Sequence, residues 1–183
     1  MRLIIASDIH GAARHCEQLM RVIEDERPDR VILLGDLLYH GPRNDLPDDY
    51  APKSVIEMLN GIADRIIAVR GNCEAEVDQM VLDFPCMDDF ATIDDIDVWD
   101  ESGRLSTIFI THGHVWGPGL HNSIDHMPQL RRGDVLLYGH THVKVHEERD
   151  GVTIFNPGSV GIPKDGSHSC GLYEDGRLTH LTL

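Results

Sequence analysis

The chain has 183 residues, 41% of them hydrophobic, with 31 acidic against 16 basic side chains and a net charge of −15 when histidine is counted as neutral. This length and apolar content suit one globular domain, residues 1–183, with a sizeable core. The negative charge predicts a surface that repels nucleic acid and anionic membranes, so we expect neither as a partner.

No apolar run reaches the length of a membrane span, and the apolar start, residues 1–6, is too short for the hydrophobic region of a signal peptide. The cysteines are scattered and form no CxxC pair, so neither a zinc ribbon nor a redox dithiol is indicated. We therefore expect a reducing, cytoplasmic setting.

The first half of the chain alternates strands with helices. Short apolar runs predict buried strands at residues 3–6, 30–34 and 66–69. Between them, apolar residues spaced three and four apart predict helices around residues 16–23 and 55–62. This β-α-β-α-β order favours a parallel sheet with crossover helices.

The second half is richer in strands. We expect strands at residues 104–110, 135–138, 143–148, 152–155, 171–173 and 178–183. Asp-Gly pairs at residues 150–151 and 175–176 predict tight turns and a partly antiparallel arrangement. The polar stretch 40–52 is expected to form a long loop, and the acidic run 88–100 either a solvated loop or an edge hairpin.

Polar donors beside glycine follow five of the predicted strands. The segments are Ser7–Gly11, Gly35-Asp36, Arg70–Glu74, Thr111–His114 and Tyr138–His142. Each alone has a plainer interpretation as a helix cap, a turn or a hydrogen-bonded core histidine. Together they favour one shared site, because ligands collect outside the carboxyl ends of strands in open α/β sheets. Donors of the His, Asp and Asn types suit Mn, Zn, Fe or Co and need no thiolate.

The ordered series of donors resembles the calcineurin-like metallophosphoesterase family over nearly the whole chain. The series is Asp8-x-His10, Gly35-Asp36, Gly71-Asn72, His112 and Gly139-His140-x-His142. Residues 40–44, 70–74 and 156–159 are similar to the YfcE-like group of small bacterial phosphodiesterases. The resemblance implies an α/β fold, a four-layer α/β/β/α sandwich of two mixed β-sheets flanked by helices.

The resemblance also implies two divalent metal ions, Mn in the first place, with Zn, Fe, Ni or Co as alternatives. The ligands of one ion would be Asp8, His10, Asp36 and His142. Those of the other would be Asp36, Asn72, His112 and His140, with Asp36 bridging. Asp36, Asn72 and His112 are assigned to catalysis. Two such ions beside two carboxylates would stay net positive, attract a phosphate ester and generate a hydroxide that attacks phosphorus.

Four further residues are candidates for substrate contact: Arg43, Asn44, Cys73 and His114. Arg43 would donate hydrogen bonds from its guanidinium group to a phosphate oxygen. The alternative is that the loop is held by its own hydrogen bonds and Arg43 has no such role. His114 lies two residues after His112, so it either lines the pocket or is a supporting or surface histidine. Six histidines are interpreted as surface residues: His15, His121, His126, His146, His168 and His180.

Cys73 stands where many members of the superfamily have a histidine, which is thought to protonate the leaving group. A thiol cannot act as a cationic proton donor, so we expect a preference for esters with good leaving groups. The plainer interpretation is a small buried residue beside the metals.

The expected function is a metal-dependent phosphodiesterase that acts on small phosphodiesters. One alternative is a binding scaffold, because a eukaryotic retromer subunit resembles this fold; the seven filled ligand positions count against it. The other is a protein phosphatase or nuclease of the same superfamily, against which the short, acidic chain counts. The sequence does not specify the oligomeric state and is compatible with a homo-oligomer.

Overall fold

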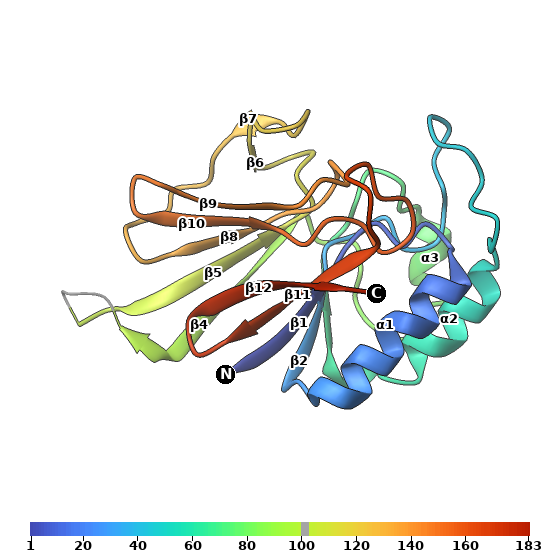
Figure 1. The fold of residues 1–183 in the computed structure, drawn as a ribbon, viewed down its shortest axis with the longest axis horizontal. Coiled ribbons are helices and arrows are strands. Elements are labelled where there is room, and N and C mark those ends of the chain that lie inside the picture. The colour runs from blue at the N-terminus through green and yellow to red at the C-terminus, as the bar shows by residue number, and fades with distance from the viewer. Residues whose placement is uncertain (100–102) are drawn as a thin grey trace.

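The computed structural model describes residues 1–99 and 103–183, which form two β-sheets packed face to face (Figure 1). The strand order is β12-β11-β1-β2-β3 in the first sheet and β4-β5-β8-β10-β9 in the second. In each sheet three neighbouring strands pair in parallel, and the other pairings are antiparallel. The predicted pair of mixed sheets is therefore confirmed.

Helices cover the outer face of the first sheet (Figure 1). Its strands are β1 (Arg2–Ala6), β2 (Arg30–Leu33), β3 (Ile66–Ala68), β11 (Ser169–Glu174) and β12 (Arg177–Thr182). The helices are α1 (Ala13–Glu26), α2 (Pro52–Asn60), the 3-10 helix η1 (Ala63–Arg65) and the short α3 (Glu76–Gln79). Both long helices lie where the apolar spacing predicts them, and the crossover order β1-α1-β2-α2-β3 is confirmed.

The second sheet contains β4 (Phe90–Trp99), β5 (Leu105–Thr111), β8 (Val135–Leu137), β9 (Val145–Arg149) and β10 (Val152–Asn156). Strand β4 pairs antiparallel with β5 at the sheet edge. The edge-hairpin interpretation of the acidic run is thus confirmed for its described part, whereas Asp100 lies outside the described residues.

The fourth layer of the sandwich is a loop that carries the short strands β6 (Gly117–Pro118) and β7 (Asp125–His126). Its apolar side chains pack on the outer face of the second sheet: Trp116, Leu120, Met127 and Leu130. In the described part of this layer no helix forms, and the glycines and prolines of the segment give the physical reason, since both disfavour helices.

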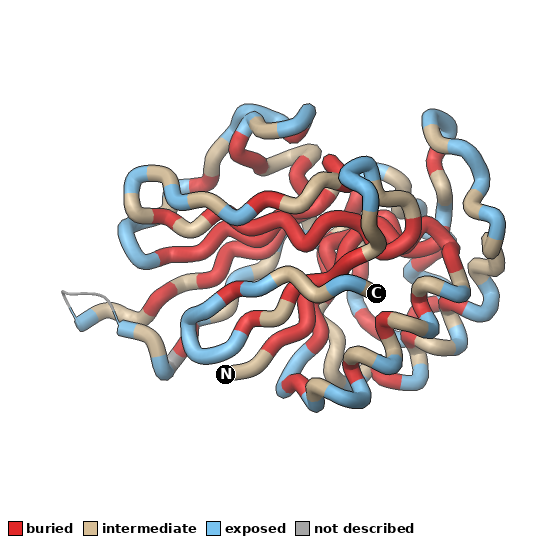
Figure 2. The backbone as a smooth tube through the Cα atoms, viewed as in Figure 1, coloured by how far each residue is buried: buried red, intermediate tan, exposed pale blue. Residues whose placement is uncertain are grey.

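Strand β1 shows why the central strands are apolar throughout. Leu3 and Ile5 pack into the core between the sheets, whereas Ile4 and Ala6 pack beneath the helices. A parallel strand covered on both faces needs apolar side chains at successive positions. Figure 2 shows buried residues along the strands of both sheets and exposed residues in the loops.

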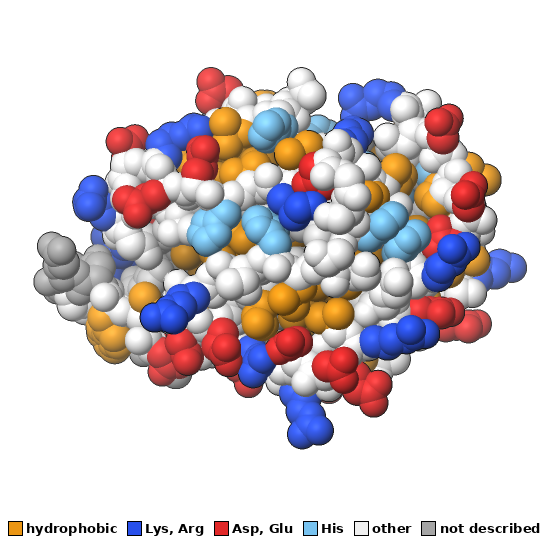
Figure 3. Space-filling view, in the orientation of Figure 1, with side chains coloured by type: hydrophobic (Ala, Val, Ile, Leu, Met, Phe, Trp, Pro, Cys, Tyr) orange, Lys and Arg blue, Asp and Glu red, His pale blue; other side chains and the backbone are white. Residues whose placement is uncertain are grey.

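The loops that follow the parallel strands of both sheets meet at one edge of the sandwich. Backbone hydrogen bonds join the loops within each sheet, from Asp8 N to Gly35 O (3.1 Å) and from Gly139 N to His112 O (2.8 Å), and between the sheets, from Gly161 N to Asp8 O (3.0 Å). The chemistry predicted from the five strand ends is therefore brought to one place. On the molecular face drawn in Figure 3, acidic and basic side chains are interspersed and several histidines are exposed between them.

Candidate metal centre

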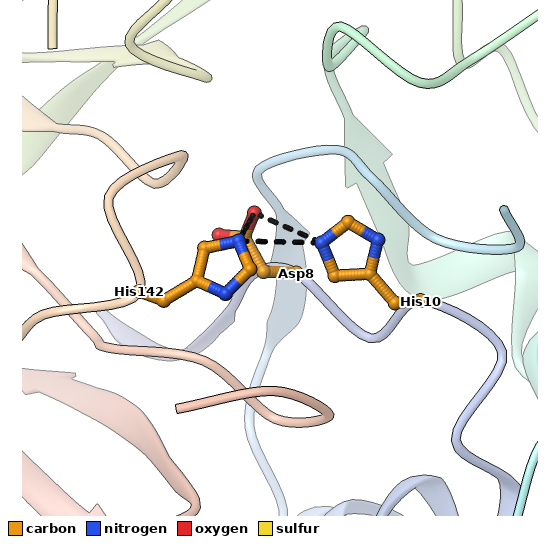
Figure 4. A group of neighbouring side chains, drawn as sticks. All are labelled: Asp8, His10 and His142. Atoms are coloured by element: carbon orange, nitrogen blue, oxygen red, sulfur yellow. Dashed lines mark hydrogen bonds and ion pairs between the residues drawn. The ribbon is translucent and has the colours of Figure 1, made fainter. Parts of the chain in front are cut away.

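Three predicted ligands form a buried cluster, the deep group, defined as Asp8, His10 and His142. His142 Nε2 lies 3.2 Å from Asp8 Oδ1 and 3.3 Å from His10 Nε2. His10 Nε2 lies 3.6 Å from the same carboxylate oxygen. Figure 4 shows the two imidazole rings turned toward Asp8 from separate segments of the chain.

Three other predicted ligands form the open group, defined as Asn72, His112 and His140. His112 Nε2 lies 3.2 Å from Asn72 Oδ1 and 3.3 Å from His140 Nδ1. Asp36 connects the two groups, because its Oδ2 atom lies 3.7 Å from His10 Nε2 and 3.6 Å from His112 Nε2. The structure thus brings all seven predicted ligands together and places Asp36 between the other six.

Backbone carbonyls fix the orientation of three of the four imidazoles. The Nδ1 atoms of His10, His112 and His142 lie 2.6 to 2.7 Å from main-chain carbonyl oxygens. A carbonyl only accepts, so each Nδ1 carries the proton and each Nε2 keeps a lone pair. This is the tautomer that a metal-binding imidazole needs.

The donor atoms of the cluster fit a metal ion. Their lone pairs point toward one another with few protons between them, and a bound cation would remove the resulting repulsion. The Nε2 atoms of His10 and His142 both act as acceptors, and the buried Asp8 Oδ1 has no hydrogen-bond partner among the described residues. An unpaired buried carboxylate oxygen is costly unless a cation compensates it. Three-residue sets with metal-ligand geometry include Asp8 with His10 and His142, and Asp8 with Asp36 and His112.

The other oxygen of Asp8 is held by the protein. Oδ2 accepts hydrogen bonds from Ser7 Oγ (2.5 Å) and His140 N (3.0 Å). Ser159 Oγ donates to the Asp8 carbonyl at 2.8 Å. Gly139 must lack a side chain here, because a Cβ atom would lie 1.9 Å from Ser7 Oγ. Asp8 is therefore oriented so that one oxygen alone faces the imidazoles.

Asn156 braces the loop that carries His140 and His142. Its Nδ2 donates to Gly139 O at 2.8 Å and to Thr141 Oγ1 at 3.1 Å. Residues 156–159, one of the segments similar to the YfcE-like group, thus hold both the β8 loop and the Asp8 loop through Asn156 and Ser159.

Glu74 holds the loop of Asp36 in place, a role that the sequence did not indicate. Its carboxylate accepts hydrogen bonds from the backbone N–H groups of Asp36 (2.8 Å), Leu37 (2.7 Å) and Gly71 (2.5 Å). Cys73 N donates to Asp36 Oδ1 at 2.8 Å, which leaves Oδ2 toward the histidines. Burial and then the charge of Asp36 raise the pKa of Glu74.

Sharp backbone turns aim most of the ligands. Five of the seven have φ in the left-handed region: Asp8 (55°), His10 (51°), Asp36 (55°), His140 (69°) and His142 (60°). A side chain in this region costs about 1–2 kcal/mol per residue, although Asp and His tolerate it better than most. Such strain is concentrated at functional sites, so the backbone independently marks this cluster as one.

The two groups differ in their electrostatics. Burial raises the pKa of the Asp8 carboxyl, but the neighbouring imidazoles outweigh burial and hold it well below its usual range. Burial lowers the pKa of His10, but the two carboxylates outweigh burial and raise it. In the open group, burial and then His112 lower the pKa of His140 to about 4. His140 is therefore a neutral imidazole at pH 7.

The candidate substrate residues lie around this cluster. Asn44 Nδ2 donates to His40 O at 2.7 Å, and the neighbouring Arg43 is exposed. Burial, followed by the charge of Asp36, raises the pKa of the Cys73 thiol. The His114 ring centroid lies 5.2 Å from that of His112. Burial and then His112 lower the pKa of His114 to about 4.

A cavity of about 370 Å³ opens beside the ligands. The residues that line it are Asp36, Arg43, Asn44, Asn72, His121, Asn122, His140, Thr141, His142 and Lys164. The surface interpretation of His121 is incomplete, because this exposed residue lines the cavity. His121, Asn122 and Lys164 carry no motif; the signal lies in the backbone, where His121 and Asn122 have φ of 48° and 73°.

Other histidines interpreted as surface residues pack against neighbours. His15 and His168 stack with ring centroids 3.5 Å apart, and His180 stacks on Phe155 at 4.5 Å. All three are half-buried. These ring contacts join segments distant in sequence, which is why local pattern did not indicate them.

The fold and this cluster together define a class of protein. The chain belongs to the calcineurin-like phosphoesterase superfamily, whose domain model matches residues 1–175. It is 44% identical to phosphodiesterase YfcE of Escherichia coli strain K12 over 100% of this chain and 92% of the relative. It is 29% identical to phosphodiesterase MJ0936 of Methanocaldococcus jannaschii, with 91% of each chain covered.

Solved structures agree with this assignment. The structure of the E. coli phosphoesterase YfcE matches with a TM-score of 0.85 and 39% identity, covering 100% of this chain and 99% of the other. Vps29 from Entamoeba histolytica shares the fold, with a TM-score of 0.62 at 18% identity over 100% and 99% of the two chains. No helix of the described residues has the length and apolar character to cross a membrane.

Proposed function

We propose that this chain is a phosphodiesterase that depends on two divalent metal ions and hydrolyses small phosphodiesters. The ligands of the two ions are the deep group and the open group, with Asp36 shared between them. One observation supports this most directly. The unprotonated Nε2 atoms of the imidazoles lie 3.2 to 3.7 Å from one another or from carboxylate and amide oxygens. The similarity to two relatives named phosphodiesterases supports a diester substrate.

The ions, when bound, activate water and stabilise the negative charge that develops on the phosphoryl oxygens. The chain's own residues prepare the site for this chemistry. Three carbonyl-anchored imidazoles keep their lone pairs directed inward, and Glu74 holds the Asp36 loop. Asp36, Asn72 and His112 lie nearest the centre of the reaction, and Arg43 lies at the rim as a cation for an anionic oxygen of the substrate.

The donor set favours Mn, with Zn, Fe, Ni and Co as the alternatives, because it combines imidazole, carboxylate and amide groups without a thiolate. The four cysteines are unpaired thiols, which supports a reducing, cytoplasmic setting. The completeness of the ligand set argues against a pure scaffold, which has no need of two carboxylates among buried imidazoles.

The test is to strip the protein with a chelator and then titrate Mn²⁺ while measuring bound metal and hydrolysis of bis(4-nitrophenyl) phosphate. We expect two ions per chain and activity that returns with them. Full activity in protein shown by elemental analysis to be metal-free would contradict the proposal.

A further inference from the structure

The cavity beside the ligands has an unusual lining. Ligand pockets are mostly apolar with a few polar groups. Here the lining consists of Asp, Arg, Asn, His, Thr and Lys side chains, and no hydrophobic residue is among the described residues that line it. The part of a substrate that fills this space is therefore hydrophilic.

Two cations face this cavity without an ion-pair partner in the described part of the chain, Arg43 and Lys164. The chain has 31 acidic and 16 basic residues, so carboxylates are plentiful elsewhere. Asp36, the carboxylate of the lining, is directed at the imidazoles of the metal cluster. The two cations are thus available to an anion that enters the cavity.

The backbone of Lys164 is fixed relative to the metal ligands. Lys164 N donates to His142 O at 2.9 Å, and the ring of His142 donates through Nδ1 to Ile162 O at 2.6 Å. The adjacent Asp165 is bound by Lys144, through the backbone N–H and through Nζ, both at 2.7 Å. The carboxylate nearest to Lys164 in sequence is therefore already paired with another lysine.

Arg43 reaches the cavity from a different loop, the long segment after β2. This loop packs on Cys73, because a Cβ atom on Gly41 would lie 3.0 Å from Cys73 Sγ. Arg43 and Lys164 therefore belong to separate loops, and each loop contacts the metal cluster through its backbone.

We propose, on the basis of the phosphodiesterase function proposed above, that the substrate is a hydrophilic phosphodiester with a second anionic group. One ester arm is a polyol or sugar-like group that carries a carboxylate or a phosphate. Arg43 and Lys164 bind this second anion, and the polar lining binds the hydroxyls. A diester has a single negative charge at the metal cluster, so the two additional cations select for the second charge.

The test compares three 4-nitrophenyl phosphodiesters that differ in the retained arm: ethyl, 2,3-dihydroxypropyl and 2-carboxy-2-hydroxyethyl. The same nitrophenolate leaves in each, so differences in kcat/KM report on recognition of the arm. We expect the carboxylated ester to exceed the ethyl ester by about tenfold, as one charge-assisted contact provides. This preference should shrink as salt is raised.

Lys164→Gln and Arg43→Gln should each lower the ratio of carboxylated to ethyl ester toward one. Lys53→Gln and Arg21→Gln remove an exposed cation away from the cavity and should leave the ratio unchanged. Equal kcat/KM for all three esters, or an unchanged ratio in both cavity variants, would overturn this inference while the phosphodiesterase function stands. Failure of the metal-loaded protein to hydrolyse any of the three would overturn both.

Discussion

The deep group and the open group contain similar ligands in different surroundings. Asp8 and His10 are 0% exposed and His142 is 3% exposed, and carbonyl oxygens hold both deep imidazoles through Nδ1. In the open group Asn72 is exposed and His140 is half-buried and directs Nδ1 at His112. His112 of the open group is also 0% exposed and carbonyl-anchored, so the difference lies in Asn72 and His140. These two residues line the cavity, whereas His142 is the one member of the deep group that reaches it.

This difference separates two tasks within one cluster. A ligand set enclosed by protein binds its ion tightly and exchanges it slowly, because the side chains are already ordered. An open set leaves room for water and substrate, which catalysis requires. We therefore expect the deep position to retain its ion after the open position has lost it.

Replacing Asp36 should have the largest effect, because this residue belongs to both groups. Asp36→Asn removes a charge shared by two cations, and we expect activity to fall by about 10²–10³-fold with weaker metal binding at both positions. Metal content after gel filtration measures this directly. Two tightly bound ions per chain in the variant would show that Asp36 is not the bridge.

The dependence of rate on the leaving group tests whether the reaction takes place beside the open group. Burial raises the pKa of Cys73, so it is a neutral thiol at pH 7, and the pKa of His114 is lowered to about 4, so it is a neutral imidazole; neither is a cationic acid. We expect a steep fall of rate with leaving-group pKa. Cys73→His should flatten it and speed alkyl esters by about 10²-fold, within the range of general acid help.

The measurement is the slope of log rate against leaving-group pKa for both proteins, under conditions where chemistry limits the rate. A shallow slope in the natural protein would show that another group already supplies the proton. The control is Cys73→Ser, which removes the thiol without adding an imidazole.

Single histidine variants test the two positions against each other. His140→Ala should leave one tightly bound ion per chain, since the deep group stays intact. His142→Ala should weaken the deep position, with a loss of affinity of at least about 10–100-fold. Calorimetric titration of metal into stripped protein checks both. Equal losses in the two variants would contradict the division into a deep and an open position.

The smallest effect is expected for the ion pair between Lys144 and Asp165, which holds the loop next to His142. Burial raises the pKa of Asp165, but the bonds from Lys144 outweigh burial and lower it. This stabilisation is present above the unfolded pKa near 3.8 and is lost as pH falls through the lower folded value. Because solvent screens the pair, Lys144→Gln should cost less than about 1 kcal/mol at pH 7.

Urea unfolding of the metal-free proteins at pH 7 and pH 3 checks this. The difference between the variant and the natural protein should be present at pH 7 and shrink at pH 3. A difference that grows at pH 3 would show that the lysine acts by some other contact.

Much of the fold and of the ligand set could be predicted because both depend on local pattern. Apolar runs gave the central strands, and the polar residues after them lie together because parallel strands end at one edge. The fourth layer could not be predicted in this way, since Trp116 and Leu130 pack on the second sheet from an irregular loop.

The features that distinguish the deep group from the open group could not be predicted from the sequence either. The choice between Nδ1 and Nε2 depends on carbonyls such as Ile162 O, which lies 20 residues from its histidine. Glu74 binds backbone N–H groups up to 38 residues away. The proposed anion-binding role of Lys164 depends on the ion pair between Lys144 and the neighbouring Asp165, which leaves Lys164 available. Such contacts between distant segments leave no periodic signal.

The left-handed turns at five ligands have an evolutionary consequence. Glycine adopts this conformation without steric penalty, so each of these Asp and His residues carries a backbone strain that glycine would avoid. Bound ions offset this, because they stabilise only the folded chain. In a lineage no longer selected for metal binding, stability alone would favour small, flexible residues at these positions. The loss of the ligands would then be driven by folding and would not need to wait for neutral drift.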